Sequence, residues 1–405
     1  MHIRPILSAM RRNKVGAFLI SLQMAVTLAI LGNAGFIVEQ RLSQMARPSG
    51  IDEPNIFTLK NQWVGQPADL SARMQADLAA LRSLPGVVDA YASNSFPMGG
   101  DGWSTGVGLH PNQKHSSVRT TLYFADEHSL VTLGTKLIAG RNFSADEIND
   151  LAENVPATPP VIIISKALAD AAFPNESALG KMFYDDDKPM TIIGVVDRLQ
   201  TPWVSEASWA SAFVENSMLQ PYHYLTSSYC LVVRTQPGKL DAVMRAAQDQ
   251  LYQVSRDRVL DEVKSFAQVR ADAYRDDRGL AIILGTVCAA LLAVTAFGIV
   301  GLTSFWVTQR RRQIGVRRAL GATRHAILAY FQTENAMIAA AGAAVGIALA
   351  LALNLWMVSS FEMARIGALY ILAPAVAVIL LGQFAVLWPA LRAASIPPAL
   401  ATRAT

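Results

Sequence analysis

Long uncharged apolar runs dominate the pattern of hydrophobic and polar positions along this chain. Four of these runs reach the roughly 20 helical residues that cross the hydrocarbon core of a bilayer. They are Val15–Val38, Leu280–Val307, Ala336–Val358 and Ile366–Trp388. The pattern predicts an integral membrane protein with four transmembrane α-helices. Because the first run is longer than a usual signal-peptide core and no A-x-A-like site follows it, we interpret it as an uncleaved anchor.

The segment 39–279 between the first two spans shows shorter periodicities. Two strand–helix–strand units predict a split βαβ-like subdomain, and a middle section rich in Gly, Pro and short strands, 99–221, predicts a second subdomain inserted into it. The fold class is therefore four membrane helices with a large α+β domain between helices 1 and 2. The first unit is Ile56–Leu59, Leu70–Leu81 and Val87–Ala92, and the second is Cys230–Val233, Leu240–Val254 and Val259–Phe266, the last extended or helical.

Two segments next to the spans are predicted to extend them. Arg256–Arg278 is heavily charged and predicts a helical stalk leading into the second span, and Glu39–Met45 continues the first. Within residues 1–14, apolar residues that include Ile3 and Leu7 recur at helical spacing. A helix lying on the membrane surface and a simple basic flank both explain that segment.

The distribution of charge predicts the orientation. Residues 39–279 hold 22 basic and 29 acidic side chains, whereas the remainder holds 13 basic and 2 acidic ones. Because Lys and Arg resist translocation, we expect residues 1–14, 308–335 and 389–405 in the cytoplasm and 39–279 and 359–365 outside. The alkaline pI follows from this topology and gives no support for nucleic-acid binding.

Several motifs with chemical meaning are absent from the sequence. No H-E-x-x-H or C-x-x-C occurs, so zinc-protease and redox functions find no support. Asp185–Asp187 lacks the spaced oxygen ligands of a calcium loop and predicts a solvated turn. His110 and His115 have no ligand partners at metal-binding spacing, and we expect no metal site.

The short loop from Thr308 to His325, TQRRRQIGVRRALGATRH, carries the most specific pattern. It contains six Arg and no acid, as expected for a cytoplasmic loop. Its ordered I-G-V-R-R-A-L-G-A string is more specific than is needed for a basic loop that only sets the orientation in the membrane. It resembles the signature of the FtsX/MacB family of ABC-transporter permeases, and so does the following stretch, Ala326–Glu334.

Other segments resemble the same family in the same order along the chain. Leu133–Phe143, Val161–Phe173 and Thr191–Asp197 are similar to strings of a MacB-like periplasmic core domain. Pro389–Thr402 is similar to the closing segment of the family. The weakest match is Asn94–Val118.

The resemblance implies that the loop docks on an ATPase. In that interpretation Ile314, Val316 and Leu320 form an apolar ridge. Gly315 and Gly321 would permit tight turning. The family usually has an acid where this chain has Gln313. The expected coupling residues are Arg310, Arg311, Arg312, Gln313, Ile314, Gly315, Val316, Arg317, Ala319, Leu320, Gly321 and Ala322.

Small and polar residues within the spans predict contacts between helices. Gly342 and Gly346 form a G-x-x-x-G pattern, which permits close helix packing in lipid, and the resemblance implies a permease dimer in which this face is used. Gln23, Asn33, Asn354 and Gln383 are expected to form hydrogen bonds between helices. The alternative is that some of them line a substrate path. Glu334 is expected to snorkel or to pair with a loop Arg rather than to relay protons.

The sequence contains no G-x-x-x-x-G-K-[ST] phosphate-binding loop, so we expect no catalytic activity and no bound cofactor in this chain. ATP and Mg²⁺ are expected on two copies of a separate ATPase subunit. The resemblance further implies a second copy or a paralogue of the permease, the inner membrane as location, and mechanotransmission from ATPase to outer domain. The leading functional hypothesis is tripartite efflux with a membrane-fusion adaptor and an outer-membrane channel. Lipoprotein release and FtsX-like regulation of cell-wall hydrolases are the alternatives.

Overall fold

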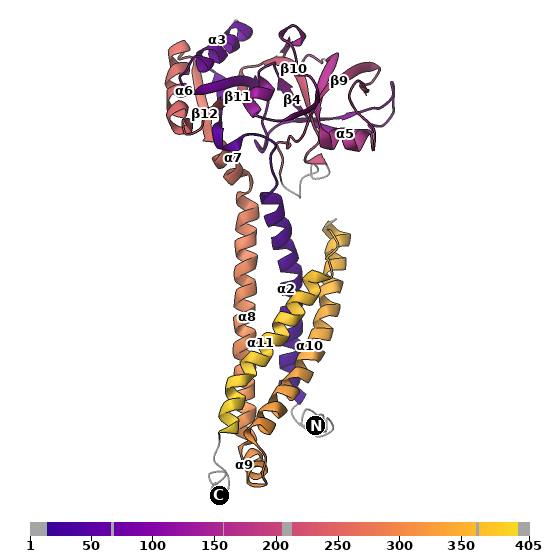
Figure 1. Cartoon of the computed structure of the whole chain (residues 1–405), viewed down its shortest axis with the longest axis vertical. Helices are drawn as coiled ribbons and strands as arrows, with labels where there is room; N and C mark the ends of the chain where they lie inside the picture. The colour runs from indigo at the N-terminus through magenta and orange to yellow at the C-terminus, as the bar shows by residue number, and fades with distance from the viewer. Residues whose placement is uncertain (1–13, 66–68, 157, 205–212, 362–363, 396–405) are drawn as a thin grey trace. The chain divides into compact units, whose positions relative to one another are not determined.

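The computed structural model describes residues 14–65, 69–156, 158–204, 213–361 and 364–395 (Figure 1). The chain divides into two compact units. The helical unit comprises Met1–Ser43 and Arg278–Thr405, and the inserted domain comprises Gln44–Asp277. The predicted surface helix before residue 14 and the end of the predicted tail after residue 395 lie outside the described residues.

Four helices of the described chain are long and apolar enough to cross a membrane, as predicted. Buried side chains such as Met24, Ile299, Phe331 and Val386 form their shared core. The short helix α9 follows α8. The helices are α2 (Lys14–Met45), α8 (Arg275–Gln309), α9 (Arg311–Ala319), α10 (Arg324–Phe361) and α11 (Leu369–Ala394).

The two glycines of the G-x-x-x-G pattern bring α10 against α2 of the same chain. A Cβ on Gly342 would lie 2.8 Å from the Ser21 carbonyl oxygen, and one on Gly346 would lie 2.9 Å from the Ala25 carbonyl oxygen. Real Cβ atoms do not come this close, so only glycine fits at both positions. The pattern is a helix-packing motif, but α2 occupies its face. The expectation that this face packs against a second permease is therefore wrong.

Polar side chains inside the spans have hydrogen-bond partners. Asn33 and Asn354 are buried, and a buried amide without a partner is costly. These contacts support the structural interpretation for one polar atom each of Asn33 and Asn354, whereas Asn33 Oδ1 and Asn354 Nδ2 have no hydrogen-bond partner among the described residues. The bonds run from Gln23 Nε2 to Val294 O (3.0 Å), from Asn33 Nδ2 to Ala350 O (3.1 Å), from Ile366 N to Asn354 Oδ1 (3.1 Å) and, with its amide turned, from Gln383 to Gln332 O (3.3 Å).

The first sheet of the inserted domain is assembled from both ends of the segment. Its strand order is β12-β1-β11-β2, and every neighbouring pair is antiparallel. Helices α3 and α6 bury Met74, Leu78 and Val243 against one face. This is the predicted split arrangement. The elements are β1 (Ile56–Trp63), α3 (Leu70–Arg82), β2 (Val87–Ser93), β11 (Ser228–Thr235), α6 (Leu240–Val254) and β12 (Arg258–Ser265).

Strand β12 corrects the predicted stalk. Arg258–Ser265 pairs with β1 rather than forming a helix, and helical structure begins only at α7 (Phe266–Ala273). The physical reason is Arg258 at the start of the strand. Its guanidinium is fully buried and donates to both carboxylate oxygens of Asp77 on α3, at 2.7 Å each. Tyr229 also donates to Asp77, at 2.8 Å.

The middle section forms the second sheet, with the strand order β3-β4-β10-β7-β9-β5. Strand β6 pairs with β10, and β8 pairs with β9. Asp186 lies in the β8–β9 turn, which is exposed as predicted. The elements are β3 (Trp103–Val107), β4 (Val118–Ala125), α4 (Ser129–Leu133), β5 (Leu137–Gly140), β6 (Asn149–Ala152), β7 (Val161–Ser165), α5 (Lys166–Ala172), β8 (Met182–Asp185), β9 (Lys188–Val196) and β10 (Ser217–Leu225), with 3₁₀ turns η1 (Glu53–Asn55) and η2 (Ala145–Glu147).

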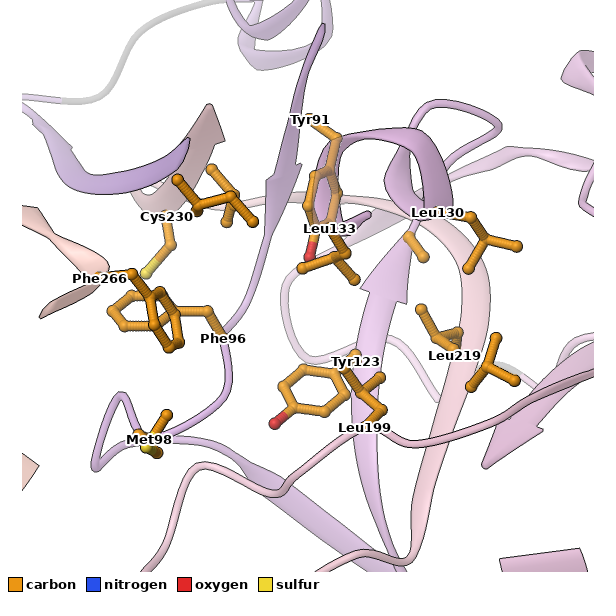
Figure 2. Packing of buried hydrophobic residues seen from close by; sticks show 14 of the residues in the cluster. Tyr91, Phe96, Met98, Tyr123, Leu130, Leu133, Leu199, Leu219, Cys230 and Phe266 are labelled. Carbon is orange, nitrogen blue, oxygen red and sulfur yellow. The ribbon is translucent and has the colours of Figure 1, made fainter. Parts of the chain in front are cut away.

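One apolar cluster contains residues of both sheets. Figure 2 shows buried members of this cluster, including Tyr91 from β2, Tyr123 from β4 and Phe266 from α7. The Tyr123 hydroxyl donates to the Gln200 carbonyl oxygen, so its burial leaves no unpaired donor. Because the two subdomains share this core, they form one domain.

A second ion pair anchors α7 within the inserted domain. The Arg270 guanidinium donates to the Glu53 carboxylate and to the carbonyl oxygens of Met45 and Arg47. Burial raises the pKa of Glu53, but the hydrogen bonds from Arg270 and Ser49 outweigh it, and the net pKa lies below its ordinary value. The segment after α2 is thus joined to the helix that precedes α8.

Candidate functional site: the basic loop around helix α9

Short-range backbone geometry ends helix α9. At its end, Gly321 has φ +98°, a conformation that favours glycine. Its N–H donates to Arg318 O, and the N–H of Ala322 donates to Arg317 O, at 3.1 and 3.0 Å. This pair of bonds satisfies carbonyl groups of the last turn. Gly321 therefore performs the predicted tight turn.

The next helix begins immediately. The Thr323 hydroxyl oxygen accepts a hydrogen bond from the backbone N–H of Ala326 at 3.1 Å, which caps α10 at its amino end. The turn between α9 and α10 is therefore short, and both of its ends are fixed by hydrogen bonds. This fixes the direction in which the side chains of α9 point.

One side of α9 is buried in the helical unit. Ile314 is 5% exposed and belongs to the same apolar cluster as Trp306, Ile327 and Phe331. Gly315 is also buried and lies inside the helix, so its expected role in a turn is wrong. Since Ile314 points inward, it does not share an exposed ridge with Val316 and Leu320, and this part of the sequence interpretation is also wrong.

A shielded ion pair connects the start of the loop to α10. Arg310 Nη1 lies 3.0 and 2.7 Å from the two carboxylate oxygens of Glu334. Their side chains are 13% and 4% exposed. This is the pairing with a loop Arg expected for Glu334. Arg310 is consequently a structural anchor rather than an exposed contact.

The other side of α9 is exposed and combines apolar and basic groups. Leu320 is 83% exposed and Val316 is 47% exposed. Arg311 and Arg312 are exposed at the start of the helix. The Arg317 guanidinium lies 5.1 Å from the centre of the Tyr330 ring on α10, which orients it. We call the exposed side chains of Arg311, Arg312, Val316, Arg317 and Leu320 the α9 surface.

The remaining predicted site residues surround this surface. Gln313, Ala319 and Gly321 are exposed, and Ala322 is partly exposed. The chemistry that this arrangement permits is binding rather than catalysis. Exposed leucine and valine side chains provide apolar contact, and the arginines provide charge for acidic groups of a partner or lipid phosphates.

Sequence reasoning missed two contributors to this geometry. Thr323 follows the pattern of a helix cap, S/T/D/N at a helix start, and that signal was available. Tyr330 is positioned by its spacing from Arg317 across two helices, which no local pattern shows. In the described part of the chain, no group of three or more His, Cys, Asp or Glu side chains is arranged to hold a metal ion.

Two family models match this chain, and together they cover most of it. The FtsX-like permease C-terminal model matches residues 285–398, which include the α9 surface. The MacB-like periplasmic core domain model matches residues 21–250, more than half of the chain. The chain belongs to the MacB/FtsX-like family of ABC-transporter permeases. It is accordingly a membrane protein, and its inserted domain is the MacB-like domain.

Similar curated proteins are distant in sequence. The macrolide export ATP-binding/permease protein MacB of Neisseria gonorrhoeae is 24% identical over 66% of this chain and 39% of its own length. The uncharacterized ABC transporter permease YknZ of Bacillus subtilis is 24% identical over 85% of this chain and 84% of its own length. The chain thus spans well under half of the MacB protein that it matches.

Solved structures of similar domains were also found. The periplasmic region of MacB from Actinobacillus actinomycetemcomitans covers 57% of this chain, with 16% identity and a TM-score of 0.34. The extracellular domain of YknZ from Gram-positive bacteria covers 50% of this chain, with 17% identity and a TM-score of 0.29.

Proposed function

We propose that this chain is the permease subunit of an ABC transporter that works by mechanotransmission, with ATP hydrolysed by a separate subunit. The observation that carries the proposal is the α9 surface. An apolar side chain that is 83% exposed, flanked by arginines on a helix anchored at both ends, is suited to binding another protein. Two ATPase copies, each with its ATP and Mg²⁺, would dock on two permeases.

The fixed geometry of α9 supports transmission of force. Ile314 packs inward and Arg310 pairs with Glu334, so a push on α9 is resisted by α8 and α10 rather than absorbed by the loop. A ligand shifts a conformational equilibrium only through different contacts with its two states. The ATP-bound and ATP-free ATPase pair would supply that difference at the α9 surface. The inserted domain, which lies outside the membrane, would then change its position.

For the orientation we propose the cell inner membrane, with both termini and the α9 surface in the cytoplasm and the inserted domain in the periplasm. The charge asymmetry between residues 308–335 and 39–279 supports this. The second permease would be a copy of this chain or a paralogue. Because α2 covers Gly342 and Gly346, that partner must bind elsewhere.

For the process we propose export from the periplasm through a tripartite system, with an adaptor and an outer-membrane channel. The presence of a MacB-like domain supports export, and the name of the Neisseria relative includes macrolide export. Lipoprotein release and regulation of a cell-wall hydrolase are the alternatives. Purification of the tagged chain from its native membranes separates them, since an adaptor indicates efflux and a cell-wall enzyme indicates regulation.

Leu320→Asp tests the assignment of the coupling surface. Because Leu320 is exposed, the substitution should leave insertion and folding unchanged. We expect loss of permease-stimulated ATPase activity and of the copurifying ATPase subunit. Val64→Asp, at a 63% exposed valine of the inserted domain, is the matched control and should behave as wild type. An L320D complex with full ATPase stimulation would disprove the proposal.

A further inference from the structure

A cavity of about 230 Å³ lies between the two sheets of the inserted domain. Lys60, Cys230 and Glu262 line it from the first sheet, and Trp103 and Tyr224 line it from the second. Binding sites for small molecules are concave, commonly lie between subdomains, and combine apolar walls with a few polar groups. This cavity lies between the two sheets and combines charged and hydroxyl-bearing side chains with aromatic ones, and it lies outside the α9 surface.

Aromatic side chains form one wall of the cavity. The Trp103 ring lies edge-to-face with Tyr224 at 5.1 Å between centroids and with Phe124 at 5.5 Å. Trp103 nevertheless remains 44% exposed, so part of its indole ring is accessible to a ligand. It also lines a neighbouring cavity of about 200 Å³ whose walls include Leu122, Phe124 and Met218. An aromatic face thus stands beside a mainly apolar recess.

Negative charge exceeds positive charge at the cavity. Asp101, Glu153 and Glu262 line it, against the single cation Lys60. Lys60 Nζ lies 4.0 Å from the Asp101 carboxylate, which leaves the carboxylates of Glu153 and Glu262 without a matching cation among the lining residues. An anionic ligand would be repelled here, and a cationic one attracted.

Local backbone geometry directs Glu262 to this place. The pairing of β1 with β12 shifts between Thr58 and Lys60, so two residues of β12 face one of β1. Such a β-bulge changes the direction of a side chain. Glu262 lies in the bulge with φ +51°, a left-handed conformation that is unfavourable for a residue other than glycine. Strain of this kind is concentrated at functional sites.

We propose that this cavity binds a small organic cation of the quaternary or alkyl-ammonium class. The ammonium group would lie against the exposed part of the Trp103 ring, beside Tyr224, where cation–π attraction acts, with Glu153 and Glu262 as counter-charges. The apolar substituent would extend past Trp103 toward the second cavity. This inference goes beyond the proposed function, because binding here requires no ATPase.

Equilibrium dialysis of labelled choline against the purified full-length chain tests the site. The chain is kept in a maltoside detergent, which carries no ammonium group. We expect saturable binding with a Kd of about 1 mM, as befits one ammonium group with few contacts. The neutral isostere 3,3-dimethylbutan-1-ol should bind at least about tenfold more weakly, because it lacks the charge that cation–π attraction needs.

Two variants that are expected to change the choline affinity in opposite directions distinguish an effect on binding from misfolding. The double variant E153Q/E262Q should lower the affinity for choline about tenfold or more. Lys60→Met removes the competing cation and should raise the affinity several-fold, which misfolding does not mimic. The control D241N/D249N removes two exposed charges from α6, on the other face of the sheet, and should leave the affinity unchanged.

Three outcomes would overturn the proposal. They are the absence of saturable choline binding, equal binding of the neutral isostere, and an affinity that is the same in E153Q/E262Q as in the control. Because the readout is binding to the permease alone, none of these results bears on the ATPase coupling. Conversely, failure of the L320D test leaves the cation site intact.

Discussion

At the scale of single residues, a buried ion pair joins strand β12 to helix α3. Arg258 and Asp77 are both fully buried and pair through two hydrogen bonds. The Arg258 guanidinium also lies 4.0 Å from the centre of the Trp63 ring. Such a pair contributes little net stability compared with apolar residues, but removing one partner leaves an uncompensated charge in the interior.

Asp77→Asn should therefore destabilise the inserted domain by about 3–5 kcal/mol, the usual cost of breaking a buried pair. Chemical unfolding of the full-length chain measures the free energy of unfolding, and hydrogen exchange at the amides of β12 measures the protection of that strand. The control Asp241→Asn changes an exposed carboxylate and should have little effect. Equal protection of β12 in both variants would show that the pair does not hold this strand.

Local sequence patterns identified some residues and missed others for a physical reason. Gly321 was predictable, because a glycine after a short basic helix marks its end. Ile314 was not, since the decision between inward and outward depends on Trp306 and Phe331 from other helices. The charged start of β12 suggested a solvated helix because the sequence does not show that Arg258 has Asp77 as a buried partner.

At the scale of elements, a cluster of ionisable groups joins the two subdomains beside α3. His223 on β10 lies 3.3 Å from Asp150 and 3.9 Å from Asp126, and Arg82 of α3 lies 3.4 Å from Asp126. Burial lowers the pKa of His223, but its hydrogen bonds and charge interactions with Asp126 and Asp150 outweigh burial, and the net pKa lies above the ordinary value of 6.5.

The sign of this shift predicts a pH dependence. A histidine whose pKa is raised on folding contributes stability below pH 6.5, and the contribution is lost as the pH rises through the folded pKa. Amides of α3 and β6 should thus exchange faster with solvent, relative to their intrinsic rates, as the pH rises above 6.5. His223→Gln should remove this dependence. An unchanged pH profile in the variant would assign the effect to another group.

The glycines of α10 and α8 make a matched pair for a second test. Gly346→Leu should disrupt folding of the helical unit, because Ala25 and Leu28 of α2 already occupy the space. Gly301→Leu on α8 should be tolerated within one chain, since no atom lies within 4 Å of its Cβ position. Thermal unfolding of the purified chain in detergent measures both. Equal loss of folding in the two variants would refute the packing of α10 on α2.

Prediction from sequence succeeded best for the helices and the split sheet. Apolar length alone identifies a span, and alternation together with helical spacing identified both strand–helix–strand units. The partner of the G-x-x-x-G face was not predictable, because small residues permit close approach without specifying which helix approaches. The same limit applies to the cavity beside Trp103, which only the folded domain assembles.

At the scale of the whole molecule, the two units of the chain carry different surfaces. The helical unit carries the α9 surface at one end of its apolar helices, and the inserted MacB-like domain carries the cation cavity. The chain belongs to a family of ABC-transporter permeases. The link between the two units through α2 and α8 is the proposed path of mechanical coupling.

The most direct test of this account is site-specific photocrosslinking from position 320 in native membranes. A benzoylphenylalanine side chain replaces Leu320, which is exposed and makes room for it. The account predicts a crosslink to an ATP-binding subunit whose yield changes when ATP is trapped. The same probe at Val64 should give no such product. Absence of any crosslink from position 320 to an ATP-binding protein would contradict the central claim.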